Sequence, residues 1–189
     1  ACVDAARNVV VVGAAGGAGD QRRVGAGWGD APAPRDRADR LARGAAYRGG
    51  RIVEYRATRD ALVVVADLTG AYDPRVVTAM QRTLVYDRTL DVLIVHDRVR
   101  SAHAAGQRWL LHAVAEPALA QGRFTLAPPG PGAALSGTVL LPQAATLTTR
   151  LTRAGHWRLK LAPASPAREG EFLVVLIPRE PGAPQPSVR

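Results

Sequence analysis

The chain has 189 residues, a length that suits one domain and leaves little room for two. Its content of 47% hydrophobic and 22% charged residues excludes a chain that is disordered throughout and predicts a globular protein. The net charge of +9 is carried almost entirely by arginines spread along the chain, so charge alone does not choose between nucleic acid, membrane and acidic glycan as a partner.

Several classes of function lack their sequence signals. Cys2 is the only cysteine, which excludes an internal disulfide. No apolar stretch reaches the roughly 18 residues of a membrane-spanning helix. Nucleic-acid binding would depend on net charge alone, because neither a recognition helix nor an RNP-like strand is present. No phosphate-binding loop, dinucleotide fingerprint or GxSxG elbow occurs either. We therefore expect neither a membrane nor a nucleic acid as partner.

Strand signals follow one another along most of the chain. The first is NVVVVG (8–13), a β-branched run ended by glycine and followed by a Gly/Ala-rich loop. Residues 35–50 have the pattern of one or two helical turns at most. Ten short β-rich segments then alternate with turn residues, at 51–58, 61–69, 76–87, 91–99, 108–115, 122–128, 137–142, 145–152, 156–163 and 171–178.

The pattern within these segments predicts two kinds of strand. In HWRLKLAP (156–163) apolar side chains alternate with Arg158 and Lys160, which is typical of a strand with one solvated face. ALVVVADLT (61–69) and DVLIVHDRV (91–99) are apolar on both faces, so we expect them in the centre with another layer over each side. The predicted fold class is all-β, with stacked antiparallel sheets that form a multi-sheet sandwich.

This sandwich is expected to span residues 1–178, with a proline-rich tail at 179–189 that is extended or disordered. The chain begins without methionine and enters a strand-like run almost at once. We therefore expect it to be part of a longer protein.

The order of the strand motifs carries a resemblance. RIVEYRAT, VVVADLTGAY, QRTLVYDRTLDVLIVHDRVRS and QRWLLHAVAEP, followed by LLPQAATLTT, HWRLKLAP and FLVVLIP, resemble the C-terminal β-sandwich of heparinase II/III-like polysaccharide lyases. In that family a GD-T-AY strand, an R-L-Y…VVV-DRV hairpin and a W-LLH strand recur in this order. The opening RNVVVVGAAGGAGDQ is similar to the family's HN-LLVDG-GQ segment. The resemblance covers most of the chain.

The resemblance implies β-elimination on uronic-acid glycans, such as glycosaminoglycans or alginate, in a bacterial enzyme that is periplasmic or secreted. This reaction needs groups that neutralise the uronate carboxylate, and an acid and a base such as Tyr or His near C5 and the leaving oxygen. In the family these groups lie mainly on a preceding helical toroid. The implied partners are therefore an acidic polysaccharide and an N-terminal helical toroid of the same protein, and the sandwich alone is expected to be inactive. The alternative is a non-catalytic carbohydrate-binding or structural β-sandwich module.

The opening segment holds the predicted substrate-binding residues. Arg7 stands where the family often has a histidine that is catalytic or faces the substrate carboxylate, and Asn8 follows it. A guanidinium can neutralise a carboxylate but cannot accept a proton at physiological pH, so no catalytic residue is assigned here. The other reading of Arg7 is a solvated arginine at a strand start. Gln21, Arg22 and the indole of Trp28, in the glycine-rich loop, complete the predicted glycan-facing surface.

His112 matches the histidine of the family's W-LLH strand, which in some members helps to hold a structural zinc. That site also uses a histidine near the opening segment and an aspartate soon after it. This chain has no histidine before His96, so the triad is incomplete even with Asp30 as the carboxylate. We therefore expect no cofactor and no metal, with His112 as a weak zinc candidate and both His96 and His112 as structural residues. His103 and His156 are expected to be exposed.

Two aspartates and two tyrosines complete the set of candidates. Asp67 and Asp97 each end an apolar run, where aspartate more often caps a turn than serves as a glycosidase carboxylate. Tyr72 and Tyr86 suit either core packing or stacking on a sugar, and we favour packing.

Overall fold

The computed structural model of the chain describes residues 10–13, 50–72, 74–128, 130, 132–152 and 155–180. Within these residues every regular element is a β-strand, apart from one turn of 3-10 helix, η3 (Thr69–Ala71). The predicted all-β fold is thereby confirmed. The segment predicted to form helical turns lies, up to residue 49, outside the described residues. No helix in the described part of the chain has the length and apolar character needed to cross a membrane.

The strands are β1 (Val10–Gly13), β2 (Arg51–Ala57), β3 (Ala61–Asp67), β4 (Val77–Asp87), β5 (Val92–Ala113), β6 (Ala118–Ala120), β7 (Arg123–Leu126), β8 (Ala134–Leu141), β9 (Ala145–Leu151), β10 (Trp157–Pro163) and β11 (Ala167–Arg179). All of their pairings are antiparallel. β11 ends one residue beyond the boundary predicted at 178, and the tail from 181 onward lies outside the described residues.

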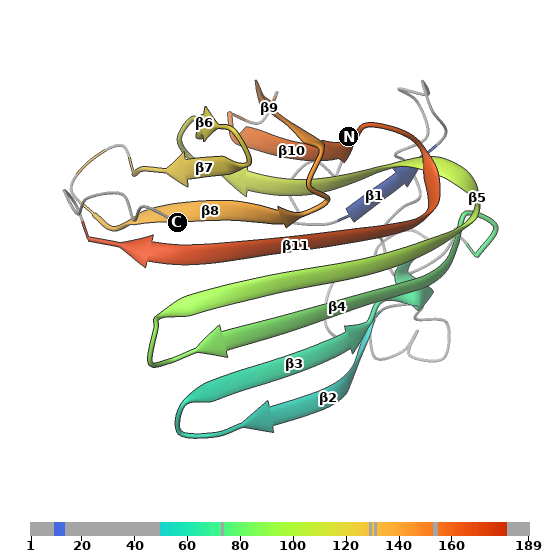
Figure 1. The fold of residues 1–189 in the computed structure, drawn as a ribbon, viewed down its shortest axis with the longest axis horizontal. Coiled ribbons are helices and arrows are strands. Elements are labelled where there is room, and N and C mark those ends of the chain that lie inside the picture. The colour runs from blue at the N-terminus through green and yellow to red at the C-terminus, as the bar shows by residue number, and fades with distance from the viewer. Residues whose placement is uncertain are drawn as a thin grey trace, which may run out of the picture.

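Two sheets share the long strand β5 (Figure 1). The main sheet has the strand order β2-β3-β4-β5-β11-β8-β7-β6 and uses the first half of β5. The small sheet uses the second half, where Trp109 pairs with Val10 of β1 on one side and with Leu161 of β10 on the other, and β9 follows β10. A strand that passes from one sheet to the other forms a corner of a β-sandwich.

The corner lies between Ser101 and Gly106, where all residues except His103 are small. Along it, the partner of Ala167 in β11 is Ala105, whereas the partner of Glu169 is Arg100, so the ladder is interrupted between them. The buried amide of Gln107 spans this interruption by donating to the carbonyl of Ala167 over 3.1 Å. A bend of this kind is typical of an irregularity in a β-ladder.

The core lies between the two sheets. From the small sheet, Leu159 and Leu161 are 0% exposed, as their alternation with Arg158 and Lys160 predicts. The inner face of the main sheet contributes Phe172 among others. Burial of these apolar side chains on facing layers is the main term that stabilises a sandwich.

Two features of the strands differ from the prediction. The segments expected at 91–99 and 108–115 are parts of one 22-residue strand, β5, because the strand continues through the bend between them, where its ladder with β11 is interrupted. The three-residue strand β6 was not predicted; it is too short to show any periodicity.

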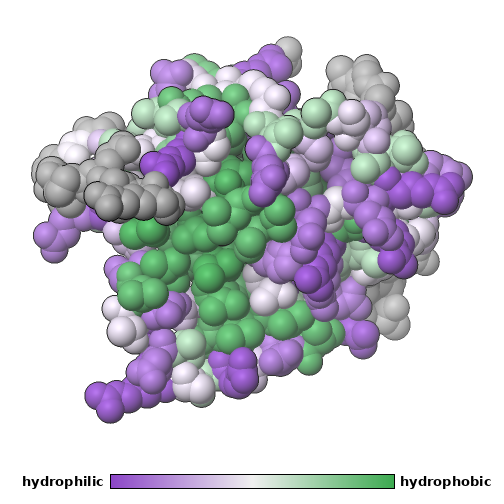
Figure 2. Space-filling view, in the orientation of Figure 1, coloured by the Kyte–Doolittle hydropathy of each residue, from purple (hydrophilic) through white to green (hydrophobic). Residues whose placement is uncertain are grey.

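The outer face of the main sheet is not covered by any described element. Val63 of β3, Val85 of β4, Ile94 of β5 and Val175 of β11 lie side by side on this face and are half-exposed. Figure 2 shows the resulting apolar patch across these strands, with a polar area beside it. The expectation of a further layer over both faces is therefore wrong for the described part of the chain, where only the inner face is covered.

Candidate functional site

The polar area on the outer face of the main sheet is built by β5 and β11. His96 Nε2 donates to Glu171 Oε1 over 2.6 Å, and Arg98 Nε donates to the same oxygen over 3.2 Å. Arg100 Nε donates to Glu169 Oε1 over 3.0 Å. Because residues of one strand that are two apart share a face, His96, Arg98 and Arg100 form one row opposite the two glutamates. His96 and Arg98 share Glu171, and Arg100 pairs with Glu169, so this row and the two glutamates form a charge ladder.

The pairing affects the acidity of Glu171. The hydrogen bond from His96, followed by the bond from Arg98, lowers the pKa of the Glu171 carboxyl below its usual value. His96 is thereby held by a carboxylate on a neighbouring strand, which supports the structural role predicted for it.

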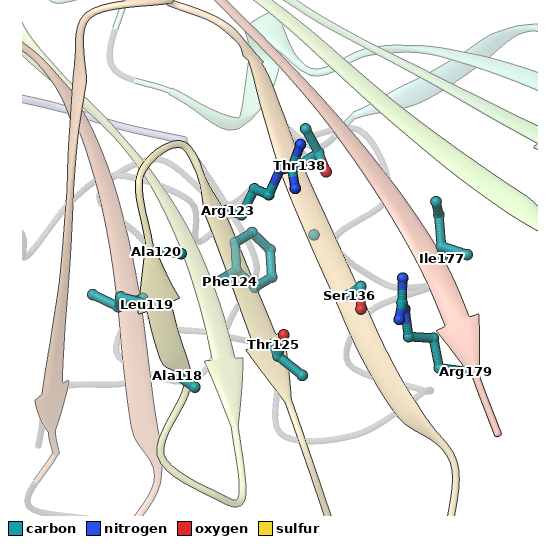
Figure 3. Close-up of a pocket in the computed structure, with 11 residues that line it drawn as sticks. Ala118, Leu119, Ala120, Arg123, Phe124, Thr125, Ser136, Thr138, Ile177 and Arg179 are labelled. Carbon is teal, nitrogen blue, oxygen red and sulfur yellow. The ribbon is translucent and has the colours of Figure 1, made fainter. Parts of the chain in front are cut away.

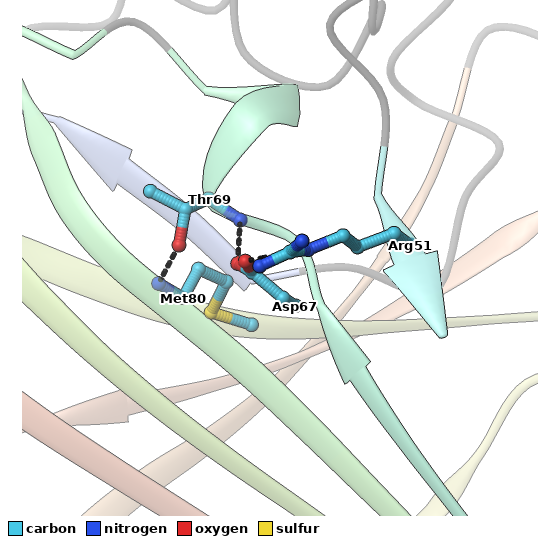
Figure 4. Close-up of polar contacts among 4 residues, drawn as sticks. All are labelled: Arg51, Asp67, Thr69 and Met80. Atoms are coloured by element: carbon cyan, nitrogen blue, oxygen red, sulfur yellow. Dashed lines mark hydrogen bonds and ion pairs between the residues drawn. The ribbon is translucent and has the colours of Figure 1, made fainter. Parts of the chain in front are cut away.

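Asp67 caps a turn at the end of β3, as predicted (Figure 4). Its Oδ1 accepts the backbone N–H of Thr69 over 3.0 Å, and its Oδ2 accepts from Arg51 Nε over 3.4 Å. Thr69 in turn accepts the N–H of Met80 over 2.9 Å, which fixes η3 against β4. The bonds from Thr69, and then Arg51, lower the pKa of Asp67.

Asp97 does not cap a turn, and the prediction that it does is wrong. It is 0% exposed and lies on the inner face of β5, directly opposite Arg82 of β4. Arg82 donates from Nε to Oδ1 over 2.7 Å and from a terminal nitrogen to Oδ2 over 2.6 Å. β5 continues past Asp97, so no turn is present there to be capped. The carboxylate is committed to a buried ion pair and is not available for glycosidase chemistry.

The two tyrosines have different surroundings. Tyr72 is buried in the core, and its hydroxyl donates to the carbonyl of Val10 over 2.8 Å, which confirms packing over sugar stacking. Burial raises the pKa of Tyr72 well above its usual range. Tyr86 is half-exposed and donates to Asp91 Oδ1 over 2.6 Å.

His112 lies in the small sheet, in β5, opposite Arg158 of β10. It is half-buried, and His103 and His156 are exposed as predicted. Within the described residues no three His, Cys, Asp or Glu side chains come together in a way that could hold a metal. A guanidinium as the cross-strand neighbour of His112 also disfavours a cation at this point. The other two positions of the family's zinc site, in and after the opening segment, lie outside the described residues, so the expectation that His112 holds no metal stays a prediction.

The predicted glycan-facing residues Arg7, Asn8, Gln21, Arg22 and Trp28 lie outside the described residues, as does Asp30. The described chain resumes at Val10, where β1 pairs with the second half of β5 and accepts the hydroxyl of Tyr72. The role of the opening segment in binding therefore stays a prediction.

The fold defines the chain as a two-layer antiparallel β-sandwich with a shared corner strand. Solved structures with a similar fold include heparan sulfate lyase HepC from Pedobacter heparinus (TM-score 0.55, 13% identity, 79% of this chain and 27% of that chain). A mutant of the same enzyme matches at TM-score 0.55 and 12% identity, over 79% of this chain and 28% of that chain. The heparinase III BT4657 gene product matches at TM-score 0.56 and 6% identity, over 82% of this chain and 27% of that chain.

These comparisons confirm the resemblance to heparinase II/III-like polysaccharide lyases at the level of the fold. This chain spans 27–28% of the length of the lyase chains that it matches. No protein-family model matches the sequence, and no curated protein matches it.

Proposed function

We propose that this chain is the β-sandwich portion of a polysaccharide lyase that cleaves uronic-acid-containing glycans by β-elimination. The observation that carries the proposal is the fold: about 80% of the chain matches part of each heparinase structure. At 6–13% identity the similarity concerns the fold alone. The proposed activity is therefore based on the resemblance of the sequence motifs and not on shared residues in the described part of the chain.

The chemistry of β-elimination fits a sandwich that acts together with another domain. Proton transfer at C5 of a uronate needs a base within hydrogen-bond reach and a group that neutralises the carboxylate. Tyr72 is buried in the core with its hydroxyl bonded to Val10, so it does not support a base role. The catalytic groups are proposed to reside on an N-terminal helical toroid of the same protein, and the sandwich alone is inactive.

The uncovered apolar patch on the main sheet supports the presence of such a neighbour. Val63, Val85, Ile94 and Val175 leave apolar surface in contact with water on a face that no described element covers. Contiguous apolar surface of this kind is typical of contacts between domains or proteins. The family resemblance further supports a periplasmic or secreted location.

Within this function, the opening segment is proposed to meet the glycan. Arg7 supplies a guanidinium for a carboxylate, Asn8 and Gln21 supply amides for hydroxyls, and Trp28 supplies an indole for a sugar ring. Each contact is modest, so binding by the sandwich alone is expected to be weak and sensitive to salt.

The test is an NMR titration of the chain with oligouronates, repeated with Arg7→Ala and Trp28→Ala. We expect both variants to weaken binding several-fold. Arg56→Ala is the matched control, because Arg56 is an exposed arginine of β2 and its loss removes the same charge. Unchanged affinity in both opening-segment variants would remove this surface from the proposal. The absence of any glycan binding would argue against the function itself.

A further inference from the structure

A pocket of about 140 Å³ opens on the main sheet where β6, β7, β8 and β11 adjoin (Figure 3). The register places Thr125, Ser136 and Ile177 side by side in one row across three strands. Arg123 lies two residues before Thr125 and opposite Thr138, and Arg179 lies two residues after Ile177. Side chains two residues apart in a strand share a face, so the two arginines flank the central row from opposite ends.

The lining of this Arg123–Arg179 pocket is rich in donors. It contains two guanidiniums and the hydroxyls of Thr125, Ser136 and Thr138, and none of the described residues that line it is acidic. Figure 3 shows the guanidinium of Arg123 beside Thr138 and that of Arg179 beside Ser136. Guanidiniums and hydroxyls together provide the directed N–H and O–H donors that carboxylate, sulfate and phosphate oxygens accept.

These two arginines differ from those of the charge ladder on the same face. Arg98 and Arg100 have side chains 65% and 66% exposed. Arg123 and Arg179 are half-buried. A charge interaction is stronger where solvent is partly excluded. An anion therefore gains more binding free energy at Arg123 and Arg179 than at the exposed arginines.

The size of the pocket limits its ligand. Sites for whole small molecules are typically about 300–1,000 Å³, so a pocket of 140 Å³ suits one charged group of a larger ligand. Ile177 in the central row, with Ala118 and Ala120 of β6, adds apolar surface beside the charged and hydroxyl groups.

We propose that the Arg123–Arg179 pocket is an oxyanion-binding subsite that takes a carboxylate or sulfate group. The assignment of an acidic glycan as the source of that group rests on the proposed function, and a free inorganic anion has the same chemistry. All lining residues fall between 118 and 179 in the sequence, so the subsite is separate in the chain from the opening segment. It would hold a glycan to the sandwich independently of Arg7 and Trp28.

The experiment is a titration of the full 189-residue chain, followed by amide and arginine Nε–H resonances, with three probes: a heparin hexasaccharide, an unsulfated oligouronate of equal length and sodium sulfate. We expect the hexasaccharide to shift the amides of Thr125, Ser136 and Thr138. Arg123→Gln and Arg179→Gln should each weaken the affinity for the hexasaccharide about tenfold, which is the effect expected for the loss of one charge-assisted hydrogen bond. Arg56→Gln, which removes an exposed charge on β2, should change affinity by less than about twofold.

Each outcome decides one part of the proposal. Glycan shifts confined to other residues, or equal losses in all three glutamine variants, would overturn the subsite and leave the proposed function standing. Sulfate shifts at the pocket without any glycan binding would support the oxyanion subsite and count against the lyase function. A single-stranded oligonucleotide of matched charge that binds the pocket as tightly as the hexasaccharide would overturn the glycan as its source. If a variant fails to fold, the chemical-shift changes of Thr125, Ser136 and Thr138 in the wild-type chain still show whether the hexasaccharide binds at the pocket.

Discussion

Arg82 and Asp97 form a two-point ion pair between adjacent strands, with the carboxylate 0% exposed and the arginine side chain 18% exposed. The pair lies on the inner face of the main sheet, beside Phe172, which is opposite Asp97 on β11. A charge in such surroundings is tolerated only while its partner and hydrogen bonds remain.

Asp97→Ala is therefore expected to lower the free energy of unfolding by about 3–5 kcal/mol, because the guanidinium of Arg82 loses its buried carboxylate. Urea denaturation followed by tryptophan fluorescence measures the loss. The control is Arg51→Ala in the Arg51–Asp67 pair, whose side chains are 78% and 36% exposed and whose contribution should be about 0–1 kcal/mol. Similar losses of unfolding free energy in both variants would contradict the expectation that the buried pair contributes more to stability than the exposed pair.

The charge ladder predicts a pH dependence of stability. The pKa of Glu171 is lowered in the folded protein, mainly by His96 and then by Arg98. Its contribution to stability is therefore fully present above the ordinary carboxyl pKa of 4.5 and is lost as the pH falls through the lowered folded pKa. The contribution is small, since the Glu171 side chain is 44% exposed.

Denaturation measured at several pH values between about 6 and 3 checks this prediction. Glu171→Gln should flatten the loss of stability below the ordinary carboxyl pKa, whereas Glu54→Gln, an exposed change on β2, should leave the profile as in the wild type. A wild-type profile retained in Glu171→Gln would show that other carboxyls cause the acid sensitivity.

Tyr72 links β1 to the rest of the sandwich, because its buried hydroxyl donates a hydrogen bond to the backbone carbonyl of Val10. Tyr72→Phe keeps the ring but leaves the Val10 carbonyl without this donor, at a cost of about 1–2 kcal/mol. Hydrogen exchange should become faster at the amides of β1 first. Tyr86→Phe is the control, because its half-exposed hydroxyl bonds to Asp91 near the β4–β5 turn. Unaltered exchange in β1 would show that the pairing with β5 alone holds the strand.

Some of this fold was predictable because it depends on local patterns. The alternation in β10 identified Leu159 and Leu161 as core residues, and Asp67 stood at a true strand end. Asp97 ended an apolar run in the same way, but its run continues into the corner of β5. A local pattern cannot distinguish a turn that ends a strand from a strand that continues, so Asp97 was assigned to the wrong contact.

The Arg123–Arg179 pocket could not be predicted from the sequence, because it depends on the order of the strands in the sheet. Its two arginines lie on β7 and β11, which become near neighbours only because β8 pairs with both. Sheet order depends on long-range pairing and on which faces are buried together, and no spacing in the sequence encodes it. The burial of Arg82 opposite Asp97 was missed for the same reason.

The last prediction concerns activity. The described residues place Tyr72 in the core and Asp97 in a buried ion pair with Arg82, and neither is available for proton transfer at a uronate. We therefore expect the 189-residue chain to release no 4,5-unsaturated product from heparin, heparan sulfate or alginate, as followed by ultraviolet absorbance. A commercial heparinase on the same substrates is the positive control. Sustained absorbance growth that survives repeated purification and disappears in Arg7→Ala would place the catalytic groups on the sandwich itself and contradict the assignment of catalysis to a separate toroid.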